Sequence, residues 1–251
     1  MPSTDADAAG VTQYDAIGEA YEKFKELPLA RYPERYTFFR EIGDVRGKSV
    51  LDLGCGTGYY SRILKQNGAR QVAGVDVSPV MIDVARRREA TEPLGIEYYV
   101  ADVRELEQLG KFDLVISAHL LCYVDESGLR DISLKIAENL ADRGEFVYVG
   151  MNPSFAYDRP GGTKYGFTVV PVEPVAGGAT MHVTAWTDPP TKIDAYHLGQ
   201  ASYEYALSEA GFRRIDWIPL DVPPAAVERY GPEFWAELFD NPVLTALRAS
   251  R

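Results

Sequence analysis

Apolar residues recur along the chain with two different periods, which predict strands and helices in turn. Between residues 49 and 149, short apolar runs typical of buried strands alternate with stretches whose apolar residues recur every three or four positions. The predicted strands are 49–53, 71–75, 97–100, 112–117 and 145–149, and the predicted helices between them include 59–66, 80–89 and 129–140. This alternation predicts parallel β-α-β units in a doubly wound, mostly parallel sheet.

The segments on either side of this region have other patterns. Residues 13–42 carry apolar positions at helical spacing, with a break near Pro28 and Pro33, and predict a helical lid ahead of the sheet. Within residues 152–200, positions 165–200 alternate apolar and polar residues in runs separated by Gly-Gly and Pro-Pro pairs. That pattern is typical of antiparallel strands and predicts an inserted cap.

The C-terminal part returns to the helix and strand rhythm of the first half. We predict a helix over 202–210, strands over 212–218 and 243–249, and a helical stretch over 228–239. The two last strands bring the predicted main sheet to seven. The sequence therefore predicts a single α/β domain, residues 1–251, with a Rossmann-like sheet.

Composition and charge exclude several classes of partner. The chain has 26 basic and 37 acidic residues, a formal net charge of -11, so we expect it to bind neither nucleic acid nor an anionic membrane. No apolar run approaches the roughly 20 residues that span a bilayer. The N-terminus lacks a charged-then-apolar leader, and Cys55 and Cys122 have neither disulfide nor metal-ligand spacing. We therefore expect a cytoplasmic protein without a metal.

Three glycines at alternate positions follow the first predicted strand, in the stretch LDLGCGTG. A P-loop needs Lys followed by Ser or Thr after its last glycine, but Tyr59 follows Gly58 here. The dinucleotide fingerprint would need its third glycine at position 59. Gly54, Gly56 and Gly58 are thus either a plain tight turn or a loop that a ligand approaches closely.

Acidic and polar residues follow the neighbouring predicted strands. Asp76 comes at the end of the second strand, where a carboxylate can accept hydrogen bonds from a ribose diol or cap the next helix. Asp102 ends the third strand, and the fourth ends at Ser117 to His119. Because the carboxyl ends of parallel strands meet at one edge of a sheet, we expect these side chains to share one crevice.

The succession DLGCGTG, VDVS, ADV and FDLVISA resembles the class I S-adenosylmethionine-dependent methyltransferases. The resemblance runs from about residue 14 to the C-terminus. It implies S-adenosylmethionine as the cofactor and S-adenosylhomocysteine as the product. The residues that it assigns to the cofactor are Tyr14, Tyr21, Arg31, Gly54, Gly56, Gly58, Asp76, Val77, Met81, Asp102, Val103 and Ser117.

The resemblance also implies a role for each group along the crevice. The glycines let the backbone approach the methionine portion, and Asp76 takes the ribose hydroxyls. Met81 lies against the adenine, whose edge is read by Asp102 and the Val103 amide. Ser117 lies beneath the sulfonium.

Three residues of the N-terminal region complete the assignment. Tyr14 and Tyr21 are seven positions apart, so they share a helix face and either close over the methionine end of the cofactor or pack in the core. Arg31 is a candidate partner for the cofactor carboxylate, with a plain exposed arginine as the alternative.

A narrower likeness concerns the N-terminal YDAIGEAYEKFKELPLARYPERYTFF, the phrase YHL and the ending YGPEFWAELFDNP. These resemble the toxoflavin-synthase-type branch of bacterial N-methyltransferases, which act on small nitrogen heterocycles. The likeness implies a small aromatic or heterocyclic acceptor, methylated at nitrogen, in secondary metabolism. Methylation of oxygen or carbon, and a catalytically silent cofactor-binding regulator, are the alternatives. The sequence leaves a homodimer open.

Histidine is the residue type best suited to remove a proton from the acceptor. His119 follows the fourth strand, where the methyl group should emerge, and is a candidate base or a residue of the pocket wall. His182 is interpreted as a strand residue. The residues expected to contact the substrate are Tyr21, His119, Tyr165, Tyr196 and His197.

Overall fold

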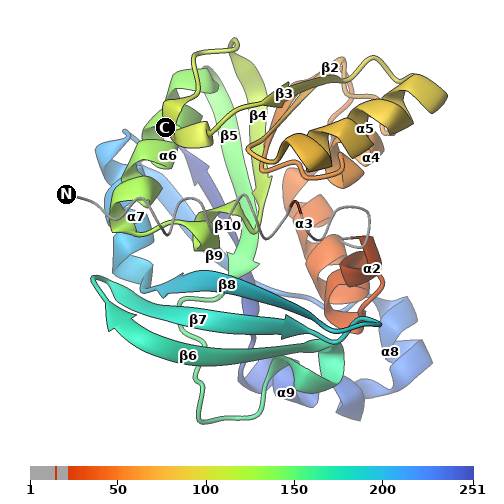
Figure 1. Ribbon diagram of the computed structural model, residues 1–251, viewed down its shortest axis with the longest axis vertical. Coiled ribbons are helices and arrows are strands. Elements are labelled where there is room, and N and C mark those ends of the chain that lie inside the picture. Colours follow the sequence, from red (N-terminus) through yellow and green to blue (C-terminus); the bar gives the residue numbers. More distant parts are fainter. Residues whose placement is uncertain (1–14, 16–21) are drawn as a thin grey trace.

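A seven-stranded sheet forms the centre of the molecule (Figure 1). The computed structural model describes Asp15 and residues 22–251; Tyr14 and Tyr21 lie outside the described residues. The strands are β1 (Ser49–Leu53), β2 (Gln71–Asp76), β3 (Glu97–Val100), β4 (Phe112–Ala118), β5 (Leu140–Met151), β9 (Arg214–Pro219) and β10 (Leu244–Ser250). Their order is β3-β2-β1-β4-β5-β10-β9, with β10 antiparallel to both of its neighbours and the first five strands parallel. The predicted doubly wound, mostly parallel seven-stranded sheet is confirmed.

Helices cover both faces of this sheet, because successive strand residues point to opposite sides. Val50 packs on one side with α3, α4 and α5, whereas Leu51 and Leu53 pack on the other with α6 and α7. Every residue of β1 is buried, as expected for a central parallel strand. The helices are α3 (Arg35–Ile42), α4 (Tyr59–Gln66), α5 (Pro79–Thr91), α6 (Glu126–Asn139) and α7 (Gln200–Glu209).

The predicted N-terminal helical segment is divided where it contains proline. A short helix α2 (Glu22–Lys25) is followed by the π-helical turn η2 (Ala30–Glu34) and then by α3. Pro33 lies inside η2, and the Arg35 amide donates to the Ala30 carbonyl five residues earlier. Proline has no N–H for the regular helical ladder, which accounts for the local change of helix type.

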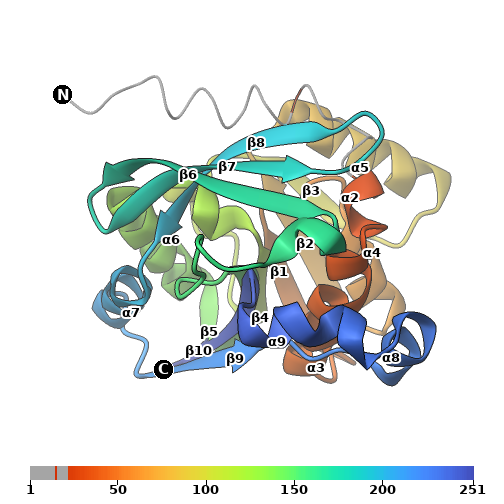
Figure 2. The ribbon, with the colours of Figure 1, turned by 90° about the horizontal axis from the view of Figure 1, so that it is seen from below.

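A second sheet of three antiparallel strands lies beside the main one (Figures 1 and 2). Its strands are β6 (Phe167–Val175), β7 (Gly178–Ala185) and β8 (Thr191–Leu198). Strand β8 packs against the 3-10 turn η4 (Leu120–Tyr123), which directly follows β4. The second sheet therefore lies at the carboxyl end of β4, as expected for an inserted cap.

The structure corrects one predicted boundary. The sequence predicted a helix to residue 140 and a strand from 145, but β5 already begins at Leu140. Phe112 pairs with Leu140 and Leu114 with Glu145, so residues 141–144 bulge out of the register of β5.

The C-terminal segment between β9 and β10 is a chain of short helices. It consists of α8 (Pro224–Tyr230), η6 (Pro232–Trp235) and α9 (Ala236–Asp240). These replace the single helical stretch predicted over 228–239, because Gly231, with a φ of 79°, and Pro232 interrupt it. The buried Trp235 donates its indole N–H to the Ala226 carbonyl and anchors the segment.

Candidate active site

The glycine loop between β1 and α4 is held close to strand β2. The amides of Gly54 and Cys55 donate to the Val75 carbonyl at 2.8 and 3.0 Å. Gly54, Gly56 and Gly58 have φ values of 72°, 54° and 78°, which other residues rarely adopt. A Cβ on Gly58 would come within 2.3 Å of the Tyr98 hydroxyl. The loop therefore needs glycine for its conformation and its packing.

Asp76 ends β2 and ties the loop to the next helix. Its carboxylate accepts from the Gly56 amide at 2.8 Å and from the Ser78 amide at 2.9 Å. Burial raises the pKa of Asp76, although the hydrogen bonds from Ser78 and Gly56 oppose this. The carboxylate lies at the carboxyl edge of the sheet, at the end of the strand next to β1, and its contact with a ribose diol remains a prediction.

Exposed apolar side chains lie near this carboxyl edge. The side chains of Val77, Val80 and Val100 are 39%, 38% and 45% exposed, which is unusual for large apolar residues. Each lies at the end of a strand or the start of a helix. They are of the type that covers an adenine face. Asp102 accepts a hydrogen bond from the Arg104 amide at 2.8 Å and forms an ion pair with the Arg104 guanidinium. Burial would raise the pKa of Asp102, but these contacts with Arg104 outweigh it and hold this pKa below its usual range.

The other residues that the sequence assigned to the cofactor are either buried in the protein or exposed on its surface. Met81 and Val103 are buried. The buried Ser117 hydroxyl donates to the Leu53 carbonyl at 2.9 Å, which joins β4 to β1. Arg31 has a side chain that is 48% exposed and pairs with Glu26. A cofactor contact for each of these remains a prediction.

Asp52 is a buried acid under the glycine loop. It is 2% exposed and accepts from the Ser61 hydroxyl at 2.6 Å. Burial raises the pKa of Asp52 to about 7, although the Ser61 hydrogen bond opposes this. At neutral pH this carboxyl is therefore close to its titration midpoint.

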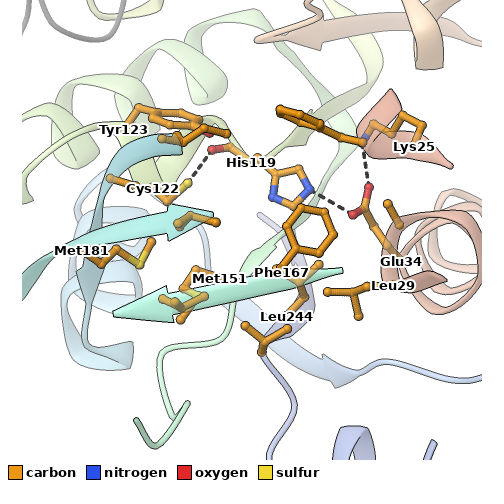
Figure 3. Close-up of a pocket in the computed structure, with 17 residues that line it drawn as sticks. Lys25, Leu29, Glu34, His119, Cys122, Tyr123, Met151, Phe167, Met181 and Leu244 are labelled. Carbon is orange, nitrogen blue, oxygen red and sulfur yellow. Dashed lines mark hydrogen bonds and ion pairs between the residues drawn. The ribbon is translucent and has the colours of Figure 1, made fainter. Parts of the chain in front are cut away.

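A largely apolar pocket opens beside the end of β4 (Figure 3). Apolar side chains make up most of its wall, as is usual for small-molecule sites. Leu29 lies on one side, Phe167 and Met181 come from the cap, and Met151 and Leu244 come from the main sheet. The pocket is therefore shared by the lid, the cap and the main sheet.

The polar side chains of the pocket wall include His119, Glu34 and Lys25. His119 directly follows β4 and is the one non-glycine residue of positive φ, 67°, in the described part of the chain. Its amide donates to the Val149 carbonyl at 2.8 Å, which fixes the backbone. Backbone strain of this kind clusters at functional sites.

Glu34 makes a contact with each of three side chains. Its Oε1 accepts from Lys25 Nζ at 2.8 Å and from the Tyr60 hydroxyl at 2.7 Å, and its Oε2 lies 3.1 Å from His119 Nε2. Burial alone would raise the pKa of Glu34, but Lys25 and His119 outweigh it and hold this pKa well below its usual range. Glu34 is thus an ionised carboxylate.

The state of Glu34 decides the proton position on His119. An ionised carboxylate can only accept hydrogen bonds, so Nε2 of His119 carries the hydrogen and Nδ1 of the neutral ring has a free lone pair. Figure 3 shows Nδ1 turned away from Glu34. A histidine held in this way can accept a proton from a bound molecule at Nδ1.

Sequence reasoning missed Glu34, Lys25 and Tyr60. Glu34 and His119 are 85 positions apart, and no spacing or motif connects them. An acid among helical residues is usually solvent-exposed, so the sequence carried no signal for this pair.

The cap residues assigned to the substrate from sequence lie outside the pocket wall. Tyr165 is fully buried, stacks on Trp235 at 5.3 Å and donates to the Phe234 carbonyl. Tyr196 is half-buried against the α6 and α7 side of the core. Their contact with a substrate remains a prediction.

The two remaining histidines are engaged elsewhere. The Tyr157 hydroxyl lies 2.6 Å from His197 Nδ1, and His197 Nε2 lies 2.9 Å from the Asn152 carbonyl. Burial lowers the pKa of His197. His182 lies on the exposed side of the cap and pairs with Asp194. A substrate contact of His197 stays a prediction.

Two further properties hold for the part of the chain that the structure describes. It contains no group of three or more His, Cys, Asp or Glu side chains that could hold a metal ion. None of its helices has the length and apolar character needed to cross a bilayer.

Known proteins resemble this chain in sequence. Residues 50–144 match the model of a family described as "Methyltransferase domain". A ubiquinone biosynthesis O-methyltransferase of Bordetella avium is 31% identical over 132 residues, which cover 50% of this chain and 54% of that protein. The enzyme of the same name from Coxiella burnetii is 36% identical over 105 residues, 41% of this chain and 44% of that protein. The chain thus spans about half the length of these curated relatives.

Solved structures resemble the chain over nearly its whole length. An S-adenosylmethionine-dependent methyltransferase from Mesorhizobium loti superposes with a TM-score of 0.63, 24% identity, and coverage of 91% of this chain and 100% of that one. The CcbJ methyltransferase from Streptomyces caelestis gives 0.65 at 20% identity, covering 95% and 98%. DhpI in complex with SAH gives 0.61 at 17% identity, covering 98% and 97%. At these identities the likeness shows the fold.

The domain match and the shared fold agree with the glycine loop after β1 and with the acidic residue Asp76 at the end of β2. Residues 50–144 therefore match a methyltransferase domain, and the chain has the fold of S-adenosylmethionine-dependent methyltransferases of known structure.

Proposed function

We propose that this protein methylates a hydroxyl oxygen of a small, largely apolar acceptor bound in the pocket beside His119. The observation that carries the proposal is the contact of His119 with the ionised Glu34 at an apolar pocket. A hydroxyl keeps its proton at neutral pH, and methylating it is helped by a base. A neutral amine or heterocyclic nitrogen has less need of one. The relatives named O-methyltransferases support the same choice.

The two halves of the site have separate roles in this proposal. The glycine loop and Asp76 hold the cofactor, which when bound supplies an electrophilic methyl group. The acceptor oxygen gives its proton to His119 Nδ1, and the proton then passes to solvent. The apolar walls from Phe167, Met181 and Leu244 keep water away from the reacting atoms and orient the acceptor.

The test is methyl transfer to matched acceptors that differ only in the accepting atom. Phenols, anilines and nitrogen heterocycles with the same apolar body are incubated with S-adenosylmethionine, and mass spectrometry locates the added methyl group. We expect transfer to the phenol, lowered by about 10²-fold in His119→Gln and unchanged in the control His182→Gln on the exposed face of the cap.

Two results would overturn this proposal. Methylation of the nitrogen acceptors alone would restore the preference for nitrogen drawn from the toxoflavin-synthase-type likeness. Cofactor binding without turnover of any acceptor would favour the catalytically silent regulator.

A further inference from the structure

Three separate elements bring polar side chains together behind His119. Lys25 comes from α2, Glu34 from η2 and Tyr60 from α4, whereas His119 follows β4. The side chains of Lys25 and Glu34 are only 5% and 2% exposed. Burying two charges is costly even when they are paired, and apolar residues of similar size would be at least as stable. The placement of this pair at the pocket wall points to a role other than stability.

We infer that Glu34 is a positioning residue for His119, and this rests on the proposed function, in which His119 takes a proton from the acceptor. The Glu34 carboxylate holds the ring in the tautomer with hydrogen on Nε2 and leaves the Nδ1 lone pair for the acceptor. After proton transfer the same carboxylate faces the positive imidazolium at 3.1 Å and stabilises it.

Lys25 and Tyr60 act on His119 indirectly, through their hydrogen bonds to Glu34. Both contact Oε1 of Glu34, which leaves Oε2 for the histidine. Their hydrogen bonds favour the ionised form of the carboxylate and fix its plane. Lys25 also lies over the Tyr60 ring, 4.7 Å from its centre, so the three groups pack as one unit.

The surroundings of His119 contain few other titratable groups. The elements packed against it contribute Glu34, Lys25 and Tyr60 from the lid and α4 and, from η4, Cys122 and Tyr123. Burial raises the pKa of the Cys122 thiol to about 12, so the thiol is neutral. Among the described residues, Glu34 is therefore the anion that contacts the ring.

The α2 helix connects the group formed by Lys25, Glu34 and Tyr60 to the glycine loop. The Thr57 hydroxyl donates to Glu22 at 3.0 Å, and Lys25, one turn later in the same helix, donates to Glu34. The base and the glycine loop are thus supported by one short helix.

The first experiment replaces the carboxylate by an amide of the same shape. In Glu34→Gln we expect kcat for the phenol acceptor to fall about 10²-fold with KM nearly unchanged, because positioning and charge act on the proton transfer. Glu237→Gln, which removes the acid of the surface pair with Lys164, is the matched control.

A second variant protects the test against misfolding. Glu34→Gln leaves the Lys25 charge buried without its carboxylate, so the double variant Lys25→Met with Glu34→Gln removes both charges together. We expect the double variant to fold and to keep the kcat defect. A normal kcat in a folded Glu34→Gln or double variant would overturn the inference.

An independent readout needs no turnover. The chain has three histidines, so long-range proton–nitrogen correlation NMR, with His119→Gln used for assignment, reports the ring tautomer directly. We expect hydrogen on Nε2 of His119 in the wild type and a mixture of tautomers in Glu34→Gln. Hydrogen on Nδ1 in the wild type would overturn the inference, even if both variants failed to fold.

These outcomes separate the inference from the proposed function. Absence of methyl transfer by the wild type would count against the proposed function, whereas the tautomer result would still decide how Glu34 acts on the ring. A wild type that methylates the phenol through His119, with an unaffected Glu34→Gln variant, would refute the positioning role alone.

Discussion

Replacing Asp52 by asparagine should make the stability of the protein less dependent on pH. Asp52 is buried under the glycine loop, and its contact with Ser61 places a hydroxyl donor 2.6 Å from the carboxylate. An asparagine side-chain oxygen can accept the same hydrogen bond without a charge. The substitution therefore removes the cost of a buried anion and keeps the shape of the site.

The magnitude follows from the two pKa values of this carboxyl. Its usual value is 3.8 and burial raises it to about 7. Between these values the unfolded chain releases the proton while the folded protein retains it, so the free energy of unfolding falls as pH rises. Each pH unit corresponds to about 1.4 kcal/mol, which gives roughly 4 kcal/mol over the whole interval.

The assay is denaturant unfolding of the wild type and Asp52→Asn, without cofactor, at several pH values. The asparagine variant should be the more stable, and its advantage should grow by roughly 3 kcal/mol between about pH 5 and about pH 8. Taking the difference between the two proteins cancels the titration of other groups. Asp240→Asn, at an exposed position of α9 beside Arg159, should keep the pH dependence of the wild type over this range.

Two results would refute this reasoning. A difference between the variant and the wild type that is constant over this range would mean that Asp52 ionises in the folded protein as it does in the unfolded chain. A variant that is less stable above pH 7 would mean that the carboxylate makes a favourable contact which asparagine cannot replace.

Three further predictions concern the two halves of the site. Asp76→Ala should weaken S-adenosylmethionine binding by about 1.5–3 kcal/mol, because a charged acceptor is lost; unchanged affinity by calorimetry would remove Asp76 from the cofactor site. Met181→Trp should fill the pocket and raise KM for the acceptor with little change in cofactor affinity, and equal losses of both in titrations would place the acceptor elsewhere. Turnover should survive EDTA, and recovery of lost activity by added Mg²⁺ would show a metal-assisted reaction.

Local sequence signals determined the main sheet and the glycine loop. The period of apolar positions placed the strands near their observed bounds, and the positive φ of Gly54, Gly56 and Gly58 agrees with their choice as glycines. Asp76 could be placed at the edge of the crevice because parallel strands end together there. Each of these inferences depends on neighbouring residues in the chain or on a general rule of α/β sheets.

Boundaries were less well determined where tertiary contacts override the local pattern. Residues 141–144 look like the end of a helix in the sequence but bulge from β5 against Phe112. In the cap, the alternation of apolar and polar residues predicted the strands, but it did not predict which face of the sheet lies against the pocket. Phe167 and Met181 line the pocket, whereas Tyr165, chosen as the aromatic candidate, is buried against Trp235.

The arrangement around His119 was decided by the tertiary structure alone. The sequence marked His119 by its place after β4, but its partner Glu34 belongs to a π-helical turn 85 residues earlier. Lys25 and Tyr60 reach the same carboxylate from two other elements. No periodicity or motif relates these positions, because their meeting depends on how the lid packs against the end of the sheet. This packing brings Lys25 and His119 to Glu34, and their contacts outweigh the effect of burial and keep Glu34 ionised. The ionised carboxylate in turn decides which nitrogen of His119 carries the hydrogen.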